Sequence, residues 1–369
     1  MPINDSISTM HKNTIQRNYE PDYAVPPGAT LLETIDSLGI DQRELAERTG
    51  LSAKTLNLII HGKAPLTQQT AMLLERVTSV PARMWNNLEA NYQEQLARLQ
   101  ARRDLAEQIE WLKTIPTKVL IDRGFIQPSR DKVVLLEQIL NFFRVAHVDA
   151  WKEGWGRGQF AFRKSEQASA VDGRLATWLQ IAELQAEQMD VETYDKTNLL
   201  AAVQRARSLT RQSPQVFLCK LASLFQASGV AFCTVPEIPG AKISGAAKWL
   251  SPTKAMIAVN RRGKKSDLFW FTLFHEVGHI LNDSKKEAYV DVTYSDDPRE
   301  RFANDFARTT LIPAKHDGRL ASLKTEKLIR EFADEIEVDP GIVVGRLQYE
   351  KLVRFDQFNH LKTTFEWAG

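Results

Sequence analysis

The chain has 369 residues, of which 43% are hydrophobic and 25% are charged, and its formal net charge is +2. This composition is that of a globular protein with two or three domains, and the near-neutral charge excludes a uniformly basic nucleic-acid coat. Any DNA binding must therefore come from a local patch.

Cysteine usage and the polar N-terminus both indicate a cytoplasmic protein. Cys219 and Cys233 form neither a C-x-x-C pair nor a disulfide framework, which fits a reducing compartment. The first residues are polar, and no apolar run reaches the roughly 18 residues of a membrane-spanning helix. We expect no membrane interaction, and we expect residues 1–24 to form a flexible tail.

Two short helices around a glycine turn are predicted next. Asp41 and Glu44 have capping-box spacing and open a helix, QRELAERT, that stops at Gly50. Ser52 caps a second helix, AKTLNLIIH, which Gly62 ends. Such a pair is typical of a helix-turn-helix.

The detailed spacing supports this interpretation. Ala46, Gly50 and Leu56 occupy the small, turn and core positions that a helix-turn-helix requires. We therefore predict a DNA-binding domain over residues 25–104. The alternative is a small helical bundle with no role in DNA binding.

The outer face of the second helix carries side chains that suit base edges and phosphates. Residues 50–74 contain no acidic residue, which favours contact with a phosphate backbone. The predicted DNA-contacting residues are Gln42, Ser52, Ala53, Lys54, Asn57, His61 and Lys63.

A long helix from about Ala82 to Arg103 carries an apolar stripe of Trp85, Leu88, Tyr92, Leu96 and Leu99. Most helix-turn-helix proteins dimerise on inverted repeats of double-stranded DNA, and this stripe can provide the interface. It can equally be intramolecular core. We expect a homodimer bound to an inverted-repeat operator.

The rest of the chain is predicted to contain a helical connector and a mixed domain. Residues 105–213 read as amphipathic helices without a chemical motif. Residues 214–369 begin with a helix and continue with short β-rich runs, GVAFCTV, AAKWL and MIAVN. The expected fold class is α+β, mainly helical, with a small sheet whose edge can pair with a substrate backbone.

A His-Glu-x-x-His motif lies in the apolar stretch DLFWFTLFHEVGHIL. On a helix, His275 and His279 share one face and can bind one Zn²⁺, while Glu276 can act as the general base. We expect Asp267 to cap this helix. Gly278 in its interior suggests that another backbone packs closely there.

Catalytic zinc needs a third protein ligand. Glu300 is the best candidate, because it lies on a predicted helix with Asn304 one turn further on, where the amide can hold a ligating histidine. Glu300 can alternatively be a first-turn acid favoured by the helix dipole. The other acidic or histidine candidates are Asp283, Glu287, Asp291, Asp296, Asp297, Asp305 and His316.

Near the C-terminus, KLIREFADEIEVDPGIVVGRLQYEK repeats the helix-turn-helix spacing, with Glu337 in place of the turn glycine. We favour a helical pair packed on the mixed domain over a second DNA-binding site. Phe365 and Trp367 follow, and they either pack the last segment onto the core or cover the metal cleft.

Residues 28–98, with ELAERTGLSAKTLNLIIHGKAPLTQQTAMLLERV, resemble the Xre-type DNA-binding domain of HigA-family antitoxins. The region from about residue 229, with MIAVN, FTLFHEVGHIL, ERFANDFA and TLIP, resembles the ImmA/IrrE zinc metallopeptidases. The resemblance implies a zincin-like fold, with His275, His279 and Glu300 as zinc ligands and Glu276 as catalytic base. Phe302 and Asn282 stand where the family often has Glu and His.

Two functions follow from these features. The first is an antitoxin-like transcriptional regulator with a built-in, latent zinc endopeptidase that cleaves a repressor, a toxin partner or itself. The second is an autorepressor whose peptidase fold only docks a partner or senses metal. A purely structural zinc site is disfavoured, because such sites have four ligands and usually contain cysteine.

Overall fold

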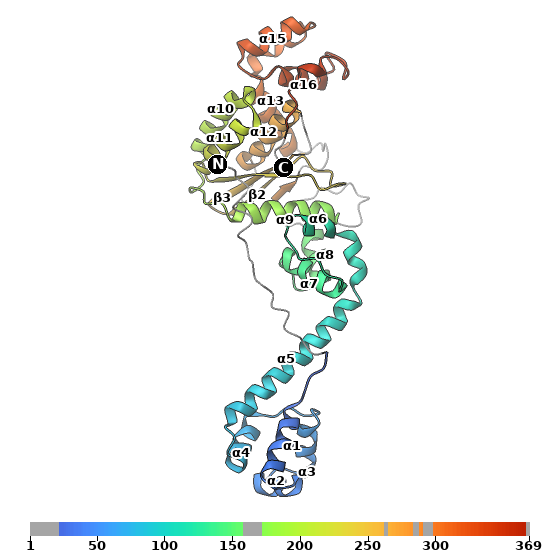
Figure 1. The fold of residues 1–369 in the computed structure, drawn as a ribbon. Helices are drawn as coiled ribbons and strands as arrows, with labels where there is room; N and C mark the ends of the chain where they lie inside the picture. The colour runs from blue at the N-terminus through green and yellow to red at the C-terminus, as the bar shows by residue number, and fades with distance from the viewer. Residues whose placement is uncertain (1–21, 158–171, 262–264, 283–287, 291–297, 367–369) are drawn as a thin grey trace. The chain divides into compact units, whose positions relative to one another are not determined.

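The computed structural model describes residues 22–157, 172–261, 265–282, 288–290 and 298–366 (Figure 1). The chain divides into two compact units, residues 1–108 and 109–369. Most of the predicted tail lies outside the described residues. Among the described residues, no helix is long and apolar enough to cross a membrane.

The described residues of the first unit form five helices around a core that includes Leu31, Leu45, Leu56, Leu74 and Trp85. Its helices are α1 (Pro27–Ser37), α2 (Gln42–Thr49), α3 (Ala53–Ile60), α4 (Gln68–Thr78) and α5 (Ala82–Ala106). The predicted helix-turn-helix corresponds to α2 and α3.

Local sequence signals set the ends of α2 and α3. The Asp41 carboxylate accepts the backbone N–H of Glu44 at 2.8 Å, and the Ser52 hydroxyl accepts that of Thr55 at 3.0 Å. Gly50 ends α2 with φ 74°, a left-handed conformation that costs glycine little. The turn between the two helices therefore forms as the sequence predicts.

The first half of α5 belongs to the core of its own unit. Trp85 is fully buried, and Tyr92 lies so close to Gly62 that a Cβ there would meet the phenol oxygen at 2.4 Å. The Glu89 carboxylate accepts the backbone N–H of Leu66 at 3.1 Å. Farther along, Leu96 is exposed. Part of the stripe is thus intramolecular core.

The second unit joins the helices of the predicted connector to the mixed domain. It begins with η1 (Ile109–Thr114), α6 (Thr117–Asp122), α7 (Lys132–Phe143), α8 (Val148–Arg157), α9 (Gly173–Glu187), α10 (Lys196–Arg207), η2 (Ser208–Arg211) and α11 (Pro214–Gln226). It continues with β1 (Val230–Val235), β2 (Gly245–Ser251), β3 (Lys254–Asn260), α12 (Ser266–Asn282), β4 (Ala288–Val290) and α13 (Pro298–Leu311). It ends with η3 (Ala314–His316), α14 (Asp317–Leu320), α15 (Glu326–Glu335), α16 (Pro340–Tyr349) and η4 (Asn359–Leu361).

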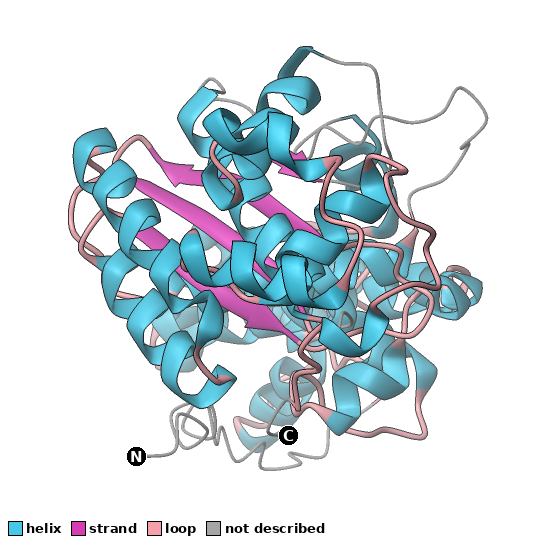
Figure 2. Ribbon diagram, turned by 90° about the horizontal axis from the view of Figure 1, so that it is seen from above, coloured by secondary structure: helices cyan, strands magenta, loops and turns pink. Residues whose placement is uncertain are grey.

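The sheet has the order β1-β3-β2-β4, with β1 parallel to β3 and the other neighbours antiparallel. Helix α9 covers one face, and α12 lies with α10 and α11 on the other (Figures 1 and 2). Alternation along β2 fits this arrangement, because the Lys248 ammonium reaches Glu183 of α9 at 2.7 Å while Ala247 and Trp249 join the core around α12. The predicted α+β, mainly helical fold class is confirmed.

Helix α12 is the central element of the second unit. Phe269, Trp270, Leu273, Phe274 and Val277 are all buried in its core. The burial of α12 explains why its sequence is apolar on nearly every side.

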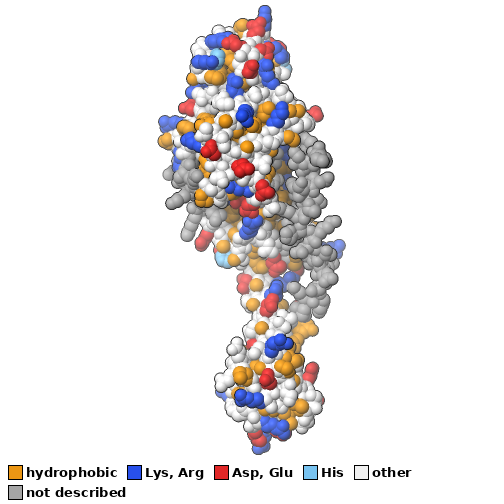
Figure 3. All heavy atoms as spheres, turned by 90° about the vertical axis from the view of Figure 1, so that its left-hand side faces the viewer, with side chains coloured by type: hydrophobic (Ala, Val, Ile, Leu, Met, Phe, Trp, Pro, Cys, Tyr) orange, Lys and Arg blue, Asp and Glu red, His pale blue; other side chains and the backbone are white. Residues whose placement is uncertain are grey.

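Acidic and basic side chains are mixed on the face of the molecule drawn in Figure 3, which agrees with the near-neutral net charge.

Contacts at the two ends of α12 differ partly from the expectation. The helix begins at Ser266, so Asp267 does not cap it but pairs with the Lys362 ammonium at 2.5 Å. A Cβ at Gly278 would lie 2.8 Å from the Cα of Ala303 in α13. The close backbone approach expected at Gly278 is therefore confirmed.

Candidate metal centre and nucleic-acid interface

Three of the predicted site residues meet between α12 and α13. The Nε2 atoms of His275 and His279 lie 3.0 Å apart. Glu300 of α13 places one carboxylate oxygen 3.3 Å from His275 Nε2 and the other 3.3 Å from His279 Nε2. The three side chains offer ligand atoms within 4.8 Å of one another, a separation that can hold one metal ion.

The two histidines of the cluster are buried, and Glu300 is partly buried. His275 is 2% exposed and His279 is 1% exposed. Burial raises the pKa of Glu300, but hydrogen bonds to His275 and His279 outweigh it and hold this pKa at about 2. Glu300 is therefore a carboxylate at neutral pH, the form in which it can bind a metal.

Asn304 sets the orientation of the first imidazole. His275 Nδ1 lies 3.1 Å from Asn304 Oδ1. An amide oxygen only accepts, so Nδ1 carries the proton in this contact, and on metal binding Nε2 would give up its hydrogen bond to Glu300 and direct its lone pair at the cluster. Two imidazole nitrogens and a carboxylate form the donor set of a three-ligand catalytic zinc site, so the residues present fit a divalent metal.

Glu276 lies next to His275 in the sequence and is fully buried. A Cβ at Gly245 of β2 would come within 2.5 Å of its Oε1 atom. Glycine at this position thus leaves room for the carboxylate between the helix and the sheet. Gly245 was not identified from the sequence, although a glycine in a strand is a signal of close approach.

The remaining candidate ligands do not join the cluster within the described residues. The Asp305 carboxylate pairs with Arg308 at 3.2 Å, and the His316 ring lies 5.6 Å from that of Phe332. The others, Asp283, Glu287, Asp291, Asp296 and Asp297, lie outside the described residues.

The predicted DNA-contacting side chains are all exposed on the first unit: Gln42, Ser52, Ala53, Lys54, Asn57, His61 and Lys63. The His61 ring nitrogen Nδ1 donates to the backbone oxygen of Asn57 at 2.8 Å, which fixes the ring against the end of α3. Within the described chain, no ion pair engages Lys54 or Lys63. Both ammonium groups are available to phosphates.

The C-terminal repeat of the helix-turn-helix spacing has a different role. Its second helix, α16, buries Ile342, Val343, Val344, Arg346 and Leu347. A helix buried on so many sides cannot enter a DNA groove. The interpretation as a helical pair packed on the mixed domain is confirmed, and Glu337 adopts the positive φ of 58° that a turn glycine would take.

Phe365 packs the C-terminal segment onto the core. Its ring lies 5.2 Å from that of Phe217 and 5.8 Å from that of Phe269, and its side chain is 1% exposed. Of the two expectations for this residue, core packing is the one observed. Trp367 lies outside the described residues.

Comparisons with known proteins match one segment in each of the two units. Residues 31–85 match the helix-turn-helix family, and residues 232–347 match the IrrE N-terminal-like peptidase family. YddM, an uncharacterized HTH-type transcriptional regulator of Escherichia coli, is 33% identical over 63 residues, which are 17% of this chain and 67% of that protein. The stated resemblance to the two families is confirmed.

One solved structure also resembles part of the chain. It is a proposed antidote protein of a plasmid maintenance system from Nostoc punctiforme, 28% identical over 24% of this chain and 94% of that chain. The TM-score is 0.22, a value from which we draw no structural conclusion.

Proposed function

We propose that this chain, which belongs to the helix-turn-helix regulators and carries an IrrE N-terminal-like domain, is a transcriptional regulator with a built-in zinc endopeptidase. The observation that carries the proposal is the buried cluster of His275, His279 and Glu300 beside Glu276. A cytoplasmic location follows from the proposed action on DNA.

The DNA-binding half acts through α3. Its exposed Asn57 suits an adenine edge, and Lys54 and Lys63 suit phosphates. A dimer would place two α3 helices in successive major grooves of an inverted repeat, with half-sites about one helical turn apart. Leu96, which is exposed on the second half of α5, offers apolar surface that such a dimer can bury.

In the peptidase half, His275, His279 and Glu300 would hold Zn²⁺. When bound, this ion polarises a peptide carbonyl and makes water a stronger nucleophile at neutral pH. Glu276 would take a proton from the attacking water and pass it to the leaving amide nitrogen. Asn304 holds the His275 ring through Nδ1, which would leave Nε2 to bind the ion.

The substrate is a protein: a repressor, a toxin partner or this chain itself. An extended segment can add its backbone to the sheet edge formed by β4, which pairs with β2, and β2 lies next to Glu276 through Gly245. A continuously active peptidase would destroy the regulator's control, so the activity would be latent until a signal arrives. This assigns the chain an antitoxin-like role in which cleavage relieves repression.

The competing function is a non-catalytic module that docks a partner or senses metal. Glu276 favours catalysis over this alternative. A carboxylate that is 0% exposed carries a large desolvation cost, and a docking surface gains nothing from one buried next to a proposed metal ligand in the sequence. A general base needs that position.

The decisive experiment compares Glu276→Gln with wild type in a reporter strain. The variant should keep zinc and operator binding but lose any cleavage-dependent derepression, because it removes the base and leaves the three proposed ligands. Reporter output is measured beside immunoblots of regulator and partner. Glu335→Gln, at an exposed glutamate that pairs with Arg319, is the matched control. Equal derepression by Glu276→Gln and wild type would favour docking.

The DNA half is tested separately by footprinting and salt titration. Asn57→Ala should relax base preference, whereas Lys63→Ala should weaken binding to all sequences and reduce the salt slope by about one unit. Absence of a protected symmetric site with the purified protein would contradict the regulator assignment.

A further inference from the structure

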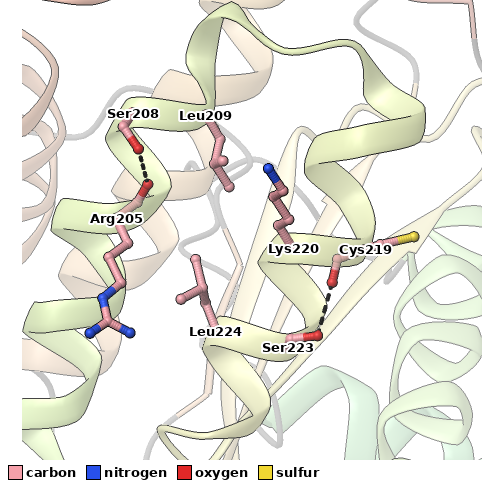
Figure 4. A pocket seen from close by; sticks show the side chains of 7 residues that line it. All are labelled: Arg205, Ser208, Leu209, Cys219, Lys220, Ser223 and Leu224. Carbon is pink, nitrogen blue, oxygen red and sulfur yellow. Dashed lines mark hydrogen bonds between the residues drawn. The ribbon is translucent and has the colours of Figure 1, made fainter.

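A groove of about 440 Å³ lies in the second unit between α10 with η2 on one side and α11 on the other, and neither the metal centre nor the DNA-facing helix accounts for it. We call it the α10–α11 groove. One wall carries Arg205, Ser208 and Leu209, and the other carries Lys220, Ser223 and Leu224. Figure 4 shows the two leucines between the walls and the two cationic side chains extending in different directions. The groove thus joins an apolar floor to positive charge.

The charge of this region is unusual for a near-neutral protein. Residues 196–236 contain five lysines and arginines but no Asp or Glu. Arg207 donates to the backbone oxygens of Thr310 and Ile336 at 2.9 and 2.6 Å, and Arg211 to that of Val338 at 3.1 Å. These two cations therefore hold the fold together.

Arg205 and Lys220 make no such contacts with other elements of the described chain. Both are exposed, and no ion pair of the described chain includes either of them. The groove hydroxyls are also turned inward, since Ser208 donates to the Arg205 backbone oxygen at 2.8 Å and Ser223 to that of Cys219 at 3.2 Å. The lining consequently offers positive charge and apolar surface with no acidic group to neutralise it.

We propose that the α10–α11 groove binds an acidic amphipathic helix of a partner protein, with an apolar stripe on the leucines and carboxylates on Arg205 and Lys220. Val216, one turn before Lys220 on α11, is 38% exposed and extends the apolar surface along the helix. Helix-in-groove binding uses anchors at this spacing, and opposite charge at the two cations sets the orientation.

The test uses the full-length chain and fluorescence anisotropy. The acidic probe is a labelled helical peptide with a leucine stripe and glutamates at both ends. The basic probe is the same peptide with every glutamate replaced by lysine. The acidic probe should bind. Its affinity should fall at least about threefold as added salt shortens the Debye length and screens the attraction between the opposite charges. The basic probe should not bind.

A charge swap locates the site. Arg205→Glu with Lys220→Glu should weaken the acidic probe at least about tenfold and create binding of the basic probe. The control is Lys315→Glu with Lys327→Glu, at two exposed lysines elsewhere in the unit, and it should change neither affinity. If the double glutamate variant does not fold, Arg205→Ala and Lys220→Ala are measured singly, and each should weaken the acidic probe.

Three results would overturn the proposal. One is failure of wild type to bind the acidic probe, and another is equal binding by wild type and the groove variants. The third is loss of self-association in Arg205→Glu with Lys220→Glu, measured by sedimentation, since that would make a second copy of this chain the occupant.

Discussion

Asn304 acts on the proposed metal only through His275, so its contribution can be separated from that of the ligands. Asn304→Ala removes the oxygen 3.1 Å from Nδ1 and frees the ring to turn. We expect zinc affinity to fall about 10- to 100-fold while the fold is retained. Affinity is measured by competition with a chromophoric chelator.

Asn304→Asp is the control, because it keeps an acceptor oxygen at the same place and should retain most of the affinity. Wild-type affinity in Asn304→Ala would show that the ring is held by its packing alone.

A second residue, Gly278, fixes the distance between the two helices of the cluster. In Gly278→Ala the new Cβ would lie 2.8 Å from the Cα of Ala303, a backbone atom that cannot swing away. We expect a loss of about 1–3 kcal/mol in the free energy of unfolding of the second unit, the usual cost of overpacking. Urea denaturation of the metal-free protein measures it.

The matched control is Gly318→Ala in α14, where a Cβ meets nothing within 4 Å. Alanine replaces a helical glycine there at no steric cost, so we expect stabilisation by about 0.5–1 kcal/mol. If both variants change stability equally, close packing of α12 on α13 is not the reason for Gly278.

At the scale of elements, the C-terminal segment fastens the start of α12. The Ser266 backbone N–H donates to Thr363 at 2.9 Å, and the Ser266 hydroxyl donates to Asp339 at 2.8 Å. The Thr363 hydroxyl donates to the same Asp339 carboxylate at 2.6 Å. The helix that carries the motif is therefore anchored by residues far along the chain.

Lys362 tests this anchor. Its ammonium and the Asp267 carboxylate are 12% and 16% exposed, so Lys362→Met would leave a buried charge unpaired. We expect a loss of about 3–5 kcal/mol in the free energy of unfolding, most of which Asp267→Asn in the same chain should restore. A double-mutant cycle by urea denaturation measures the coupling, and additive effects would rule out a direct pair.

These elements also show what the sequence can and cannot predict. The caps at Asp41 and Ser52, the turn at Gly50 and the pairing of His275 with His279 depend on neighbours within one or two helical turns, so local spacing predicts them. The anchor from Thr363 to Ser266 joins residues that are distant in sequence. Such pairs form only through tertiary packing, which leaves no periodic pattern.

Gly245 shows the same limit in the candidate site. Its role is defined by Glu276, which approaches it from another element. A single glycine in a strand signals close approach but not its partner. By contrast, Glu300 could be selected because Pro298 and the following apolar residues predict its helix, and Asn304 lies one turn away on that helix.

For the whole molecule, the two units should respond differently to metal removal. The three proposed ligands all lie in residues 109–369, and no comparable cluster of His, Cys, Asp or Glu occurs in the described part of residues 1–108. A ligand that binds only the folded form stabilises by about 4 kcal/mol at 1,000 times its Kd. In a unit of this size that corresponds to about 8–16 °C in Tm.

We therefore expect two thermal transitions by calorimetry, of which a chelator lowers only one. A fragment of residues 22–108, melted alone, should reproduce the transition that does not move, because its core of Leu31, Leu45, Leu56 and Trp85 is complete within the fragment. His275→Ala with His279→Ala in the full chain should abolish the chelator's effect, since no ion remains to be removed. A single transition, or a chelator shift of both, would show that the two units unfold together, and metal binding would then stabilise the DNA-binding unit as well.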